Sequence, residues 1–269
     1  MNDINDPSWV PEIPDGLEPL TPNPGGPGDA AELVGRHREL DSLMQAVSIG
    51  YGAHVTGERR MGKTWLIKKL QSDLTDTITA IYISAETASL DIFEKRLLDA
   101  LRAHRLIGRQ IGNWEATVGG KAKLALGPFG LKLTASLTKP ATPTPEPLDV
   151  LALLGQHHVV LIIDEITQLC ANLGPKGAAE FLHSLRAQRQ SGGPALVISG
   201  SIGLHHALRD LTPINDLSPV EVGPLTTEYA VELAARLLMG IGADPVPQLV
   251  AGIVRQTGCI PFYIHSVIK

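Results

Sequence analysis

Residues 57–64, GERRMGKT, constrain this chain more than any other part of its sequence. They fit the pattern G-x-x-x-x-G-K-[ST], follow a short apolar run over residues 53–56 and precede a stretch with helical apolar spacing that begins at Trp65. A strand, a glycine-rich turn and a helix in this order form a loop whose backbone N–H groups can cradle phosphates. The sequence therefore predicts a phosphate-binding loop on an α/β fold.

Several side chains of this loop have an expected role at a nucleotide. The glycines let the backbone fold around phosphates, Lys63 would contact the β and γ phosphates, and the Thr64 hydroxyl would ligate Mg²⁺. The alternative interpretation is a glycine-rich turn that opens an ordinary helix. The candidate nucleotide-binding residues of this segment are Gly57, Glu58, Arg59, Arg60, Met61, Gly62, Lys63, Thr64 and Trp65.

An apolar strand predicted over residues 158–163 ends at the acidic pair Asp164 and Glu165. Ligands of open α/β sheets bind at the carboxyl ends of the strands. We expect Asp164 to hold Mg²⁺ through water and Glu165 to orient or deprotonate the attacking water. The alternative is a strand end that meets solvent.

Two serines follow the next predicted strand, which covers residues 195–199. A polar side chain there would lie between the acidic pair and the γ-phosphate, so Ser199 and Ser201 are candidates for binding the attacking water. Serines beside a glycine are equally common at any strand exit.

The remaining periodicity favours strands that alternate with helices, which predicts a parallel sheet covered on both faces. Residues 121–137 alternate around a glycine and proline turn and predict a β-hairpin. The segment after residue 225 predicts a small helical lid. Further elements are expected at residues 33–47 (helix), 78–84 (strand), 89–106 (helix), 148–154 (helix), 177–190 (helix), 204–211 (helix) and 220–222 (edge strand).

Charge is unevenly distributed along the chain, although the net charge is only −5. Residues 1–32 carry seven acidic residues, no Lys or Arg, and seven prolines, which is typical of an extended or disordered tail. Residues 95–139 carry nine Lys or Arg against two acids. The tail could fold back on this basic segment, with Trp9 as an apolar anchor, or it could stay solvated without a docking site.

The hairpin lysines allow two interpretations. Lys121, Lys123, Lys132 and Lys139 could touch nucleic-acid phosphates or a protein partner. They could equally protect an edge ribbon against aggregation, which we favour because Phe129 is the hairpin's lone aromatic residue.

Other protein classes are excluded by composition. Two cysteines among 269 residues are too few for a disulfide framework, and no window reaches the ~18 apolar residues of a membrane helix. The N-terminus lacks a secretory pattern, so we expect a cytoplasmic protein without a membrane partner. An acyl hydrolase is disfavoured, because the chain has no G-x-S-x-G.

Six stretches spanning about 230 residues carry a family resemblance: LVGRHREL at 33–40, HVTGERRMGKTWLI at 54–67, VVLIIDEITQL at 159–169, VISGSIGL at 197–204, VEVGPLT at 220–226 and GCIPFYI at 258–264. In this order they resemble the AAA+ superfamily, and within it the archaeal-type ATPase and STAND-like group. The resemblance implies a P-loop NTPase fold with a parallel five-stranded sheet of order 5-1-4-3-2, flanked by helices, and a small helical lid. It also implies that Val34 and Gly35 lie near the adenine and that Pro261 closes over the nucleotide.

The sequence departs from this family at two points. Where the archaeal-type group has a Gly-Arg pair that can present an arginine to a neighbouring copy, this chain has Asn215 and Asp216, so only Arg186 or Arg209 could substitute. Relatives also continue past the lid into a further module, whereas this sequence stops at Lys269. We expect either a truncated chain or a partner module located elsewhere.

These observations predict a tail (1–30), an AAA+ ATPase core (31–225) with a hairpin insertion at about 115–140, and a lid (226–269). The expected function is Mg²⁺-dependent binding and hydrolysis of ATP to ADP, which changes the angle between core and lid in signalling, remodelling or defence. The alternatives are a nucleotide-loaded scaffold with slow turnover and a DNA-dependent ATPase. A homo-oligomer and a protein effector remain possible partners.

Overall fold

The computed structural model describes residues 4, 6–26, 32–74, 78–86, 89–127, 130–137, 146–201 and 212–269. Two compact units make up the chain: the first holds residues 1–41, 57–72 and 221–269, and the second holds residues 42–56 and 73–220. The predicted helix over 204–211, Arg209, Lys139 and the hairpin tip at Phe129 lie outside the described residues.

The second unit is built on a five-stranded sheet with the strand order β2-β6-β7-β1-β8. Its strands are β1 (Gly52–Thr56), β2 (Thr79–Ser84), β6 (Val159–Asp164), β7 (Ala195–Ser199) and β8 (Ser218–Glu221). Counted along the chain and followed from β8, this is the order 5-1-4-3-2. The predicted fold class, a parallel P-loop sheet flanked by helices, is therefore confirmed.

Strand register brings several polar residues to one edge of this sheet. Ser84 of β2 pairs with Asp164 of β6, and Val55 of β1 pairs with Ser199 of β7. The pairings of β2 with β6, β6 with β7 and β7 with β1 are all parallel, so the carboxyl ends of these strands meet at the same edge. The phosphate-loop segment begins at Gly57, directly after the last residue of β1.

Helices α3 (Leu90–Ala103), α5 (Val150–Gln156) and α6 (Ile166–Gln190) pack with the sheet around one apolar core, which includes Leu97, Leu161 and Phe181. The predicted helix over 177–190 corresponds to the part of α6 that follows a break at Gly174 (φ 69°, ψ 168°), before Pro175. This backbone conformation is accessible to glycine, and the proline cannot continue the hydrogen-bond pattern of the preceding turn. The part of α6 before this break, which begins at Ile166, was not predicted.

The predicted single helix over 89–106 is wrong, because α3 ends before His104 and a second helix, α4 (Arg105–Val118), follows. His104 is extended (φ −73°, ψ 123°), and its Nδ1 accepts the Ile107 N–H at 3.3 Å, which caps α4. A side-chain acceptor at an N-cap satisfies a backbone donor that the helix leaves unpaired.

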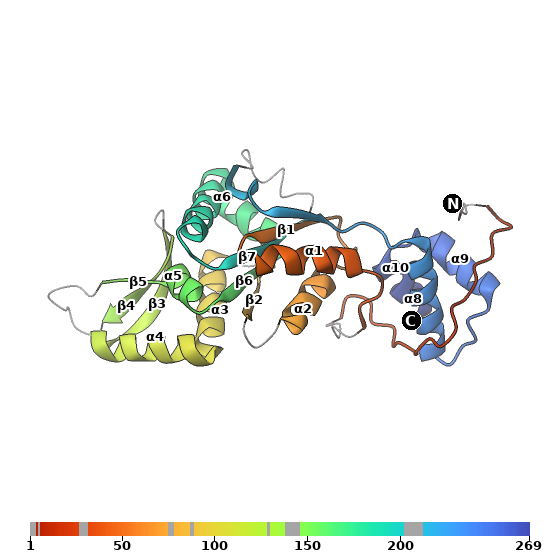
Figure 1. Cartoon of the computed structure of the whole chain (residues 1–269), viewed down its shortest axis with the longest axis horizontal. Helices are drawn as coiled ribbons and strands as arrows, with labels where there is room; N and C mark the ends of the chain where they lie inside the picture. The colour runs from red at the N-terminus through yellow and green to blue at the C-terminus, as the bar shows by residue number, and fades with distance from the viewer. Residues whose placement is uncertain are drawn as a thin grey trace. The chain divides into compact units, whose positions relative to one another are not determined.

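The predicted hairpin is present as β3 (Gly120–Gly127) and β4 (Gly130–Leu137), joined on β4 by β5 (Leu148–Asp149). The helix predicted from residue 148 therefore begins two residues later, at α5. Figure 1 shows α4 beside the hairpin. Buried Ala122, Leu124 and Leu133 belong to the core of the unit.

The first unit contains the three lid helices α8 (Thr227–Gly240), α9 (Pro247–Thr257) and α10 (Pro261–Ile268). Two helices run from one unit into the other, α1 (His37–Ser48) and α2 (Lys63–Asp73). The lid has its own apolar cluster, which includes Ala234, Leu237, Val254 and Ile264. Among the described residues, no helix combines the length and apolarity needed to cross a membrane.

The described part of the N-terminal tail has no helix or strand between residues 6 and 26, yet it is not free in solvent. Leu20 is buried in the lid cluster, and Trp9, Ile13 and Leu17 pack against that cluster. Trp9, the expected apolar anchor, thus packs on the lid cluster. The hypothesis assigned the docking to charge with Trp9 as anchor, whereas the tail is held by apolar packing and by hydrogen bonds from Arg236 and Arg255.

Candidate functional site

The phosphate-loop segment turns at residues with positive φ. Gly57 has φ 146°, and a Cβ there would lie 2.2 Å from the Val222 carbonyl oxygen, so only glycine fits this close approach. Gly62 has φ 90°, and a Cβ there would meet nothing within 4 Å. Arg60 also has a positive φ, of 73°. The loop is therefore a tight turn with open space at Gly62, where a ligand can approach the backbone.

Lys63 lies at the centre of this loop, at the first residue of α2. Its side chain is only 4% exposed, and its Nζ donates to the carbonyl oxygens of Gly57 (3.0 Å) and Glu58 (2.8 Å). A buried ammonium is costly unless it is hydrogen-bonded, and these carbonyls supply that compensation. The ammonium is thereby held inside the turn, where phosphate oxygens would form stronger, charge-assisted hydrogen bonds.

Arg36 ties the loop to the segment that precedes α1. Its guanidinium is 4% exposed and donates to the carbonyl oxygens of Met61 (3.1 Å) and Gly223 (2.5 Å), and it pairs with Glu39 at 2.8 Å. One side chain thus fixes the loop against the chain that leads into α8. The sequence did not predict this role, because no sequence pattern distinguishes a buried arginine from an exposed one.

Arg60 connects the loop with α10. Its guanidinium lies 4.6 Å from the ring centroid of Phe262 and 5.3 Å from that of Tyr263, and it donates to the Tyr263 hydroxyl at 2.8 Å. Stacking of a cation on aromatic faces is attractive, by about 0.5–1 kcal/mol at exposed sites. The expected role of Arg60 at the nucleotide did not include this contact.

The resemblance-based candidates also lie in the first unit. Val34 is buried in the lid cluster. Gly35 has φ 68°, and a Cβ there would come 2.3 Å from Tyr229 of α8, so this element packs closely on the lid. Pro261 is the first residue of α10, and Trp65 of α2 lies 6.0 Å from the His265 ring. Residues 34–35, the loop and α10 therefore belong to one compact unit.

The strand-end candidates form a hydrogen-bonded group in the second unit. Asp164 is 2% exposed; its Oδ2 accepts the Tyr82 hydroxyl at 2.9 Å, and its Oδ1 accepts the Ser199 hydroxyl. Burial and the neighbouring Asp164 carboxylate raise the pKa of Tyr82, so this hydroxyl keeps its proton and remains a donor. Sequence reasoning missed Tyr82, because a tyrosine within an apolar strand gives no distinctive signal.

Glu165 has a left-handed backbone (φ 55°, ψ 44°) at the start of α6. Its N–H donates to Ser199 Oγ at 3.1 Å, so one hydroxyl contacts both acidic residues. Such strained conformations persist where the surrounding structure enforces them. Ser201 lies further along, and its N–H donates to Thr167 Oγ1 of α6 at 3.0 Å. Ser199 therefore contacts the acidic pair through its side chain, whereas Ser201 contacts α6 through its backbone N–H.

Asp216 lies where the archaeal-type group has the arginine of its Gly-Arg pair, and here it is the acidic partner of two arginines. Asp216 forms ion pairs with Arg189 and with Arg186 (3.5 Å). Burial opposes ionisation of Asp216, but the Arg189 hydrogen bond and both arginine charges outweigh it and lower the pKa. Arg186 also donates to the Thr212 carbonyl oxygen. Arg186, our candidate substitute, is thus held within its own chain.

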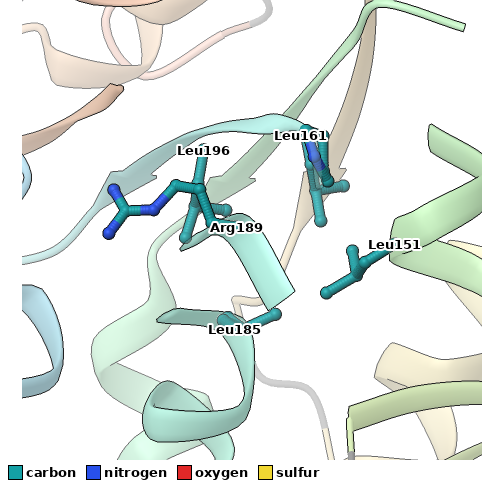
Figure 2. Close-up of a pocket in the computed structure, with 6 residues that line it drawn as sticks. Leu151, Leu161, Leu185, Arg189 and Leu196 are labelled. Atoms are coloured by element: carbon teal, nitrogen blue, oxygen red, sulfur yellow. The ribbon is translucent and has the colours of Figure 1, made fainter. Parts of the chain in front are cut away.

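A small pocket in the second unit is apolar and differs from the strand-end group. Figure 2 shows leucines of α5, α6, β6 and β7 converging, while the Arg189 guanidinium points away from them. The lining residues are Leu151, Leu161, Leu185, Arg189, Pro194 and Leu196. A lining made mainly of leucines does not suit a polyphosphate, so we assign this pocket to the packing of the core.

The donor chemistry suits a nucleotide with Mg²⁺. The loop offers a buried ammonium and an open backbone at Gly62, and the strand end offers the Asp164 carboxylate. Mg²⁺ in phosphate-transfer sites is commonly bound by one or two protein oxygens together with phosphates and water. Within the described ranges, no group of three His, Cys, Asp or Glu could hold a metal alone.

Comparisons with known proteins identify the family of the chain and show its similarity to solved structures. A family model described as an AAA domain matches residues 52–208. The Walker-type ATPase Paby2304 of Pyrococcus abyssi is similar in structure, with a TM-score of 0.59 and 19% identity over 87% of this chain and 66% of that chain. The RuvB Holliday junction branch migration motor of Thermotoga maritima has a TM-score of 0.49 and 16% identity, covering 90% and 63%. Domain III of the Thermotoga maritima replication initiation protein DnaA has a TM-score of 0.49 and 15% identity, covering 89% and 85%.

This chain spans under two thirds of the length of the Paby2304 and RuvB chains. No curated protein matches it. At these identities the structural similarity supports the fold alone, whereas the AAA domain model covers more than half of the sequence. The chain therefore belongs to the AAA domain family of P-loop ATPases.

Proposed function

We propose that this protein binds ATP with Mg²⁺ and hydrolyses it to ADP and phosphate, and that the cycle drives a conformational switch. The observation that carries the proposal is the buried Lys63 ammonium, held over the loop carbonyls of Gly57 and Glu58. A cation kept dehydrated at a tight turn is preorganised for an anionic ligand. Signalling, remodelling or defence are the outputs that we infer from the resemblance to the STAND-like group.

The loop residues would bind the phosphates. Lys63 would exchange its two carbonyl contacts for oxygens of the β and γ phosphates, and the backbone of residues 57–64 would donate further hydrogen bonds. Arg36 supports this role, since its bonds to Met61 and Gly223 hold the loop in place without using the loop's own N–H groups. Thr64 would bind Mg²⁺ through its hydroxyl.

The strand-end residues would carry the chemistry. Asp164 would bind the metal's water shell, and Tyr82 and Ser199 hold its two carboxylate oxygens in a fixed orientation. Bound Mg²⁺ would supply positive charge that neutralises the phosphates. Glu165 would accept a proton from the attacking water, so that the water oxygen attacks the γ-phosphorus as the bond to the ADP oxygen breaks.

Phosphate release from the purified chain tests the proposal. We expect release that requires ATP, is lost with EDTA and returns with Mg²⁺. Calorimetry with ATP and ADP in the same buffers measures binding separately from turnover. Absence of binding by either nucleotide would contradict the proposal, and the Lys63→Ala variant serves as the control for a contaminating ATPase.

A nucleotide-loaded scaffold with slow turnover is the second candidate. Asp216 favours it, because this residue replaces the family's arginine position and engages Arg186 and Arg189 in ion pairs. A protein that lacks an arginine at a neighbour's nucleotide loses a stabiliser of the transition state. Binding of ATP without measurable release over many hours, at high protein concentration, would favour the scaffold.

A DNA-dependent ATPase is the third candidate function, since Lys121, Lys123 and Lys132 lie on one face of the hairpin. Register pairs Lys121 with Ser136 and Lys123 with Thr134, and Lys132 lies on the same face two residues before Thr134. Phosphate release measured with and without DNA tests this partner, and a rate unaffected by DNA at low salt would remove it.

A further inference from the structure

The described N-terminal residues form a strap along the lid. This strap, defined as residue 4 and residues 6–26, places Leu20 in the lid cluster with 7% exposure. Ile4, Trp9, Ile13 and Leu17 pack on the same cluster. Figure 1 shows the strap running beside the helices of the lid. An extended segment with apolar contacts along its length is a bound element of the lid.

Hydrogen bonds fix the backbone of the strap. The Leu20 N–H donates to the Arg236 carbonyl oxygen, and Arg236 Nε donates to the Glu18 carbonyl oxygen, both at 2.9 Å. Arg255 donates to the carbonyl oxygens of Ile4 (2.9 Å) and Asp6 (3.0 Å). These bonds satisfy backbone groups that a segment without secondary structure would otherwise leave to water.

Gly240, the last residue of α8, permits the closest approach of strap and lid. A Cβ at this position would lie 1.8 Å from the Leu20 carbonyl oxygen, a distance that no side chain can occupy. Gly252 of α9 is different, because a Cβ there would meet nothing within 4 Å. The close approach of the strap therefore requires a glycine at position 240 but not at position 252.

The end of the strap reaches the aromatic residues that hold the phosphate loop. The Asn23 N–H donates to His265 Nδ1 at 3.1 Å, and a Cβ on Gly25 would lie 3.4 Å from Phe262 Cε2. The same Phe262 ring carries the Arg60 guanidinium, 4.6 Å from its centroid. Phe262 thus lies next to Gly25 of the strap and under Arg60 of the loop.

We propose that the strap regulates the phosphate loop: bound to the lid, it positions Phe262 and Tyr263 of α10, which in turn hold Arg60. Releasing the strap frees α10, loosens the loop and weakens nucleotide binding. This inference rests on the proposed function, because it concerns the regulation of the same loop. Coupling between sites typically changes affinity between 5-fold and 150-fold.

The test compares Gly240→Ala with Gly252→Ala in the full chain. Backbone amide hydrogen exchange is measured segment by segment in the absence of nucleotide. Alanine favours a helix over glycine by up to about 1 kcal/mol at either position, so helix propensity does not distinguish the variants. We expect Gly240→Ala to raise exchange in the strap, in α10 and in residues 57–64, while the β6 segment stays protected. Gly252→Ala should match the parent chain. The ATP dissociation constant should rise at least about fivefold in Gly240→Ala alone.

Leu20→Asp provides a second route to the same state, because it places a carboxylate in the lid cluster without altering a helix. A strap that exchanges freely in the parent chain would overturn the proposal. The proposal would also be overturned if exchange of the strap rises in both variants while exchange of residues 57–64 stays unchanged. If the parent chain does not bind ATP, the proposed function fails, whereas loop exchange still decides whether strap and loop are coupled.

Discussion

Ser199, the last residue of β7, donates its hydroxyl proton to Oδ1 of Asp164, the last residue of β6. Both side chains are buried, and parallel pairing of the two strands brings them to the same edge of the sheet. The same hydroxyl accepts the Glu165 N–H. Ser199 is thus a positioning residue for the Asp164 carboxylate and the Glu165 backbone. Binding the attacking water, the role expected from sequence, would use the remaining lone pair of its hydroxyl oxygen.

Replacing Ser199 with Ala should lower kcat by about tenfold while leaving the ATP dissociation constant within twofold. The loss follows because one buried hydrogen bond to a charged group contributes about 1.5–3 kcal/mol, part of which fixes carboxylate orientation. Phosphate release and calorimetry on the same preparation separate the two effects. Ser191→Ala, at an exposed position after α6, is the control. An equal fall in binding would instead indicate direct contact between Ser199 and ATP.

Replacing Lys63 with Ala should weaken ATP binding by roughly a hundredfold, because charge-assisted bonds to phosphate are lost. Lys63 is 4% exposed, so the alanine variant also removes buried aliphatic volume. Lys63→Met keeps most of the buried aliphatic volume and should show the same loss of affinity. Lys68→Ala, one turn further along α2, should bind normally. Calorimetry gives the affinities, and unchanged binding in Lys63→Met would exclude the loop assignment.

Replacing Glu165 with Gln should separate binding from chemistry. The amide keeps the shape and hydrogen-bonding reach of the side chain but cannot accept the proton of the attacking water, and such a base typically contributes 10²–10⁴-fold to the rate. ATP should therefore bind and remain uncleaved, as measured by chromatography of the bound nucleotide. Glu180→Gln, at an exposed position on α6, is the matched control. Turnover at the parent rate would remove Glu165 from the catalytic role.

The strand ends were predictable because they depend on short-range patterns: apolar runs such as residues 159–163, glycines at sharp turns and acids after strands. The sheet order was expected from the family resemblance. The residues that sequence reasoning missed act through distant contacts. Tyr82 reaches Asp164 across 82 positions, and Arg60 reaches Tyr263 across 203. The hydrophobic periodicity of a sequence does not indicate contacts between residues so far apart in the chain. The break at His104 was missed for another reason, since the apolar spacing continues across it while its cap is a single side-chain acceptor.

The tail illustrates how composition can mislead. Seven prolines and seven acids favour disorder, and the charge excess of residues 95–139 suggested an electrostatic dock. In the structure the sparse apolar residues of the tail decide its position, because Leu20 and Trp9 pack on the lid cluster. Burial of an aliphatic side chain contributes about 1.5–3 kcal/mol, more than exposed charge pairs provide.

His265 should make the lid's stability depend on pH. Its ring is 9% exposed, its Nδ1 accepts the Asn23 N–H, and burial lowers its pKa below the ordinary value of 6.5. A folded-state pKa below the unfolded one means that the unfolded chain binds the proton more readily. His265 therefore contributes its full stabilisation above about pH 6.5, and this contribution is lost as the pH falls below that value toward the lowered pKa. Protonation of Nδ1 would also remove the acceptor for Asn23.

Urea unfolding of the parent chain and of His265→Gln at pH 7.5 and pH 5.5 measures this dependence. The parent chain should lose more unfolding free energy between the two pH values than the variant, which has no titrating ring at this position. Exchange of the Asn23 amide should rise with acid in the parent beyond the intrinsic rate, because the bond to Nδ1 opens. His183→Gln, on an exposed face of α6, controls for histidine substitution itself. Identical pH dependence in the parent and His265→Gln would show that the ring stays neutral or that its proton finds another acceptor, and would remove this residue as the source.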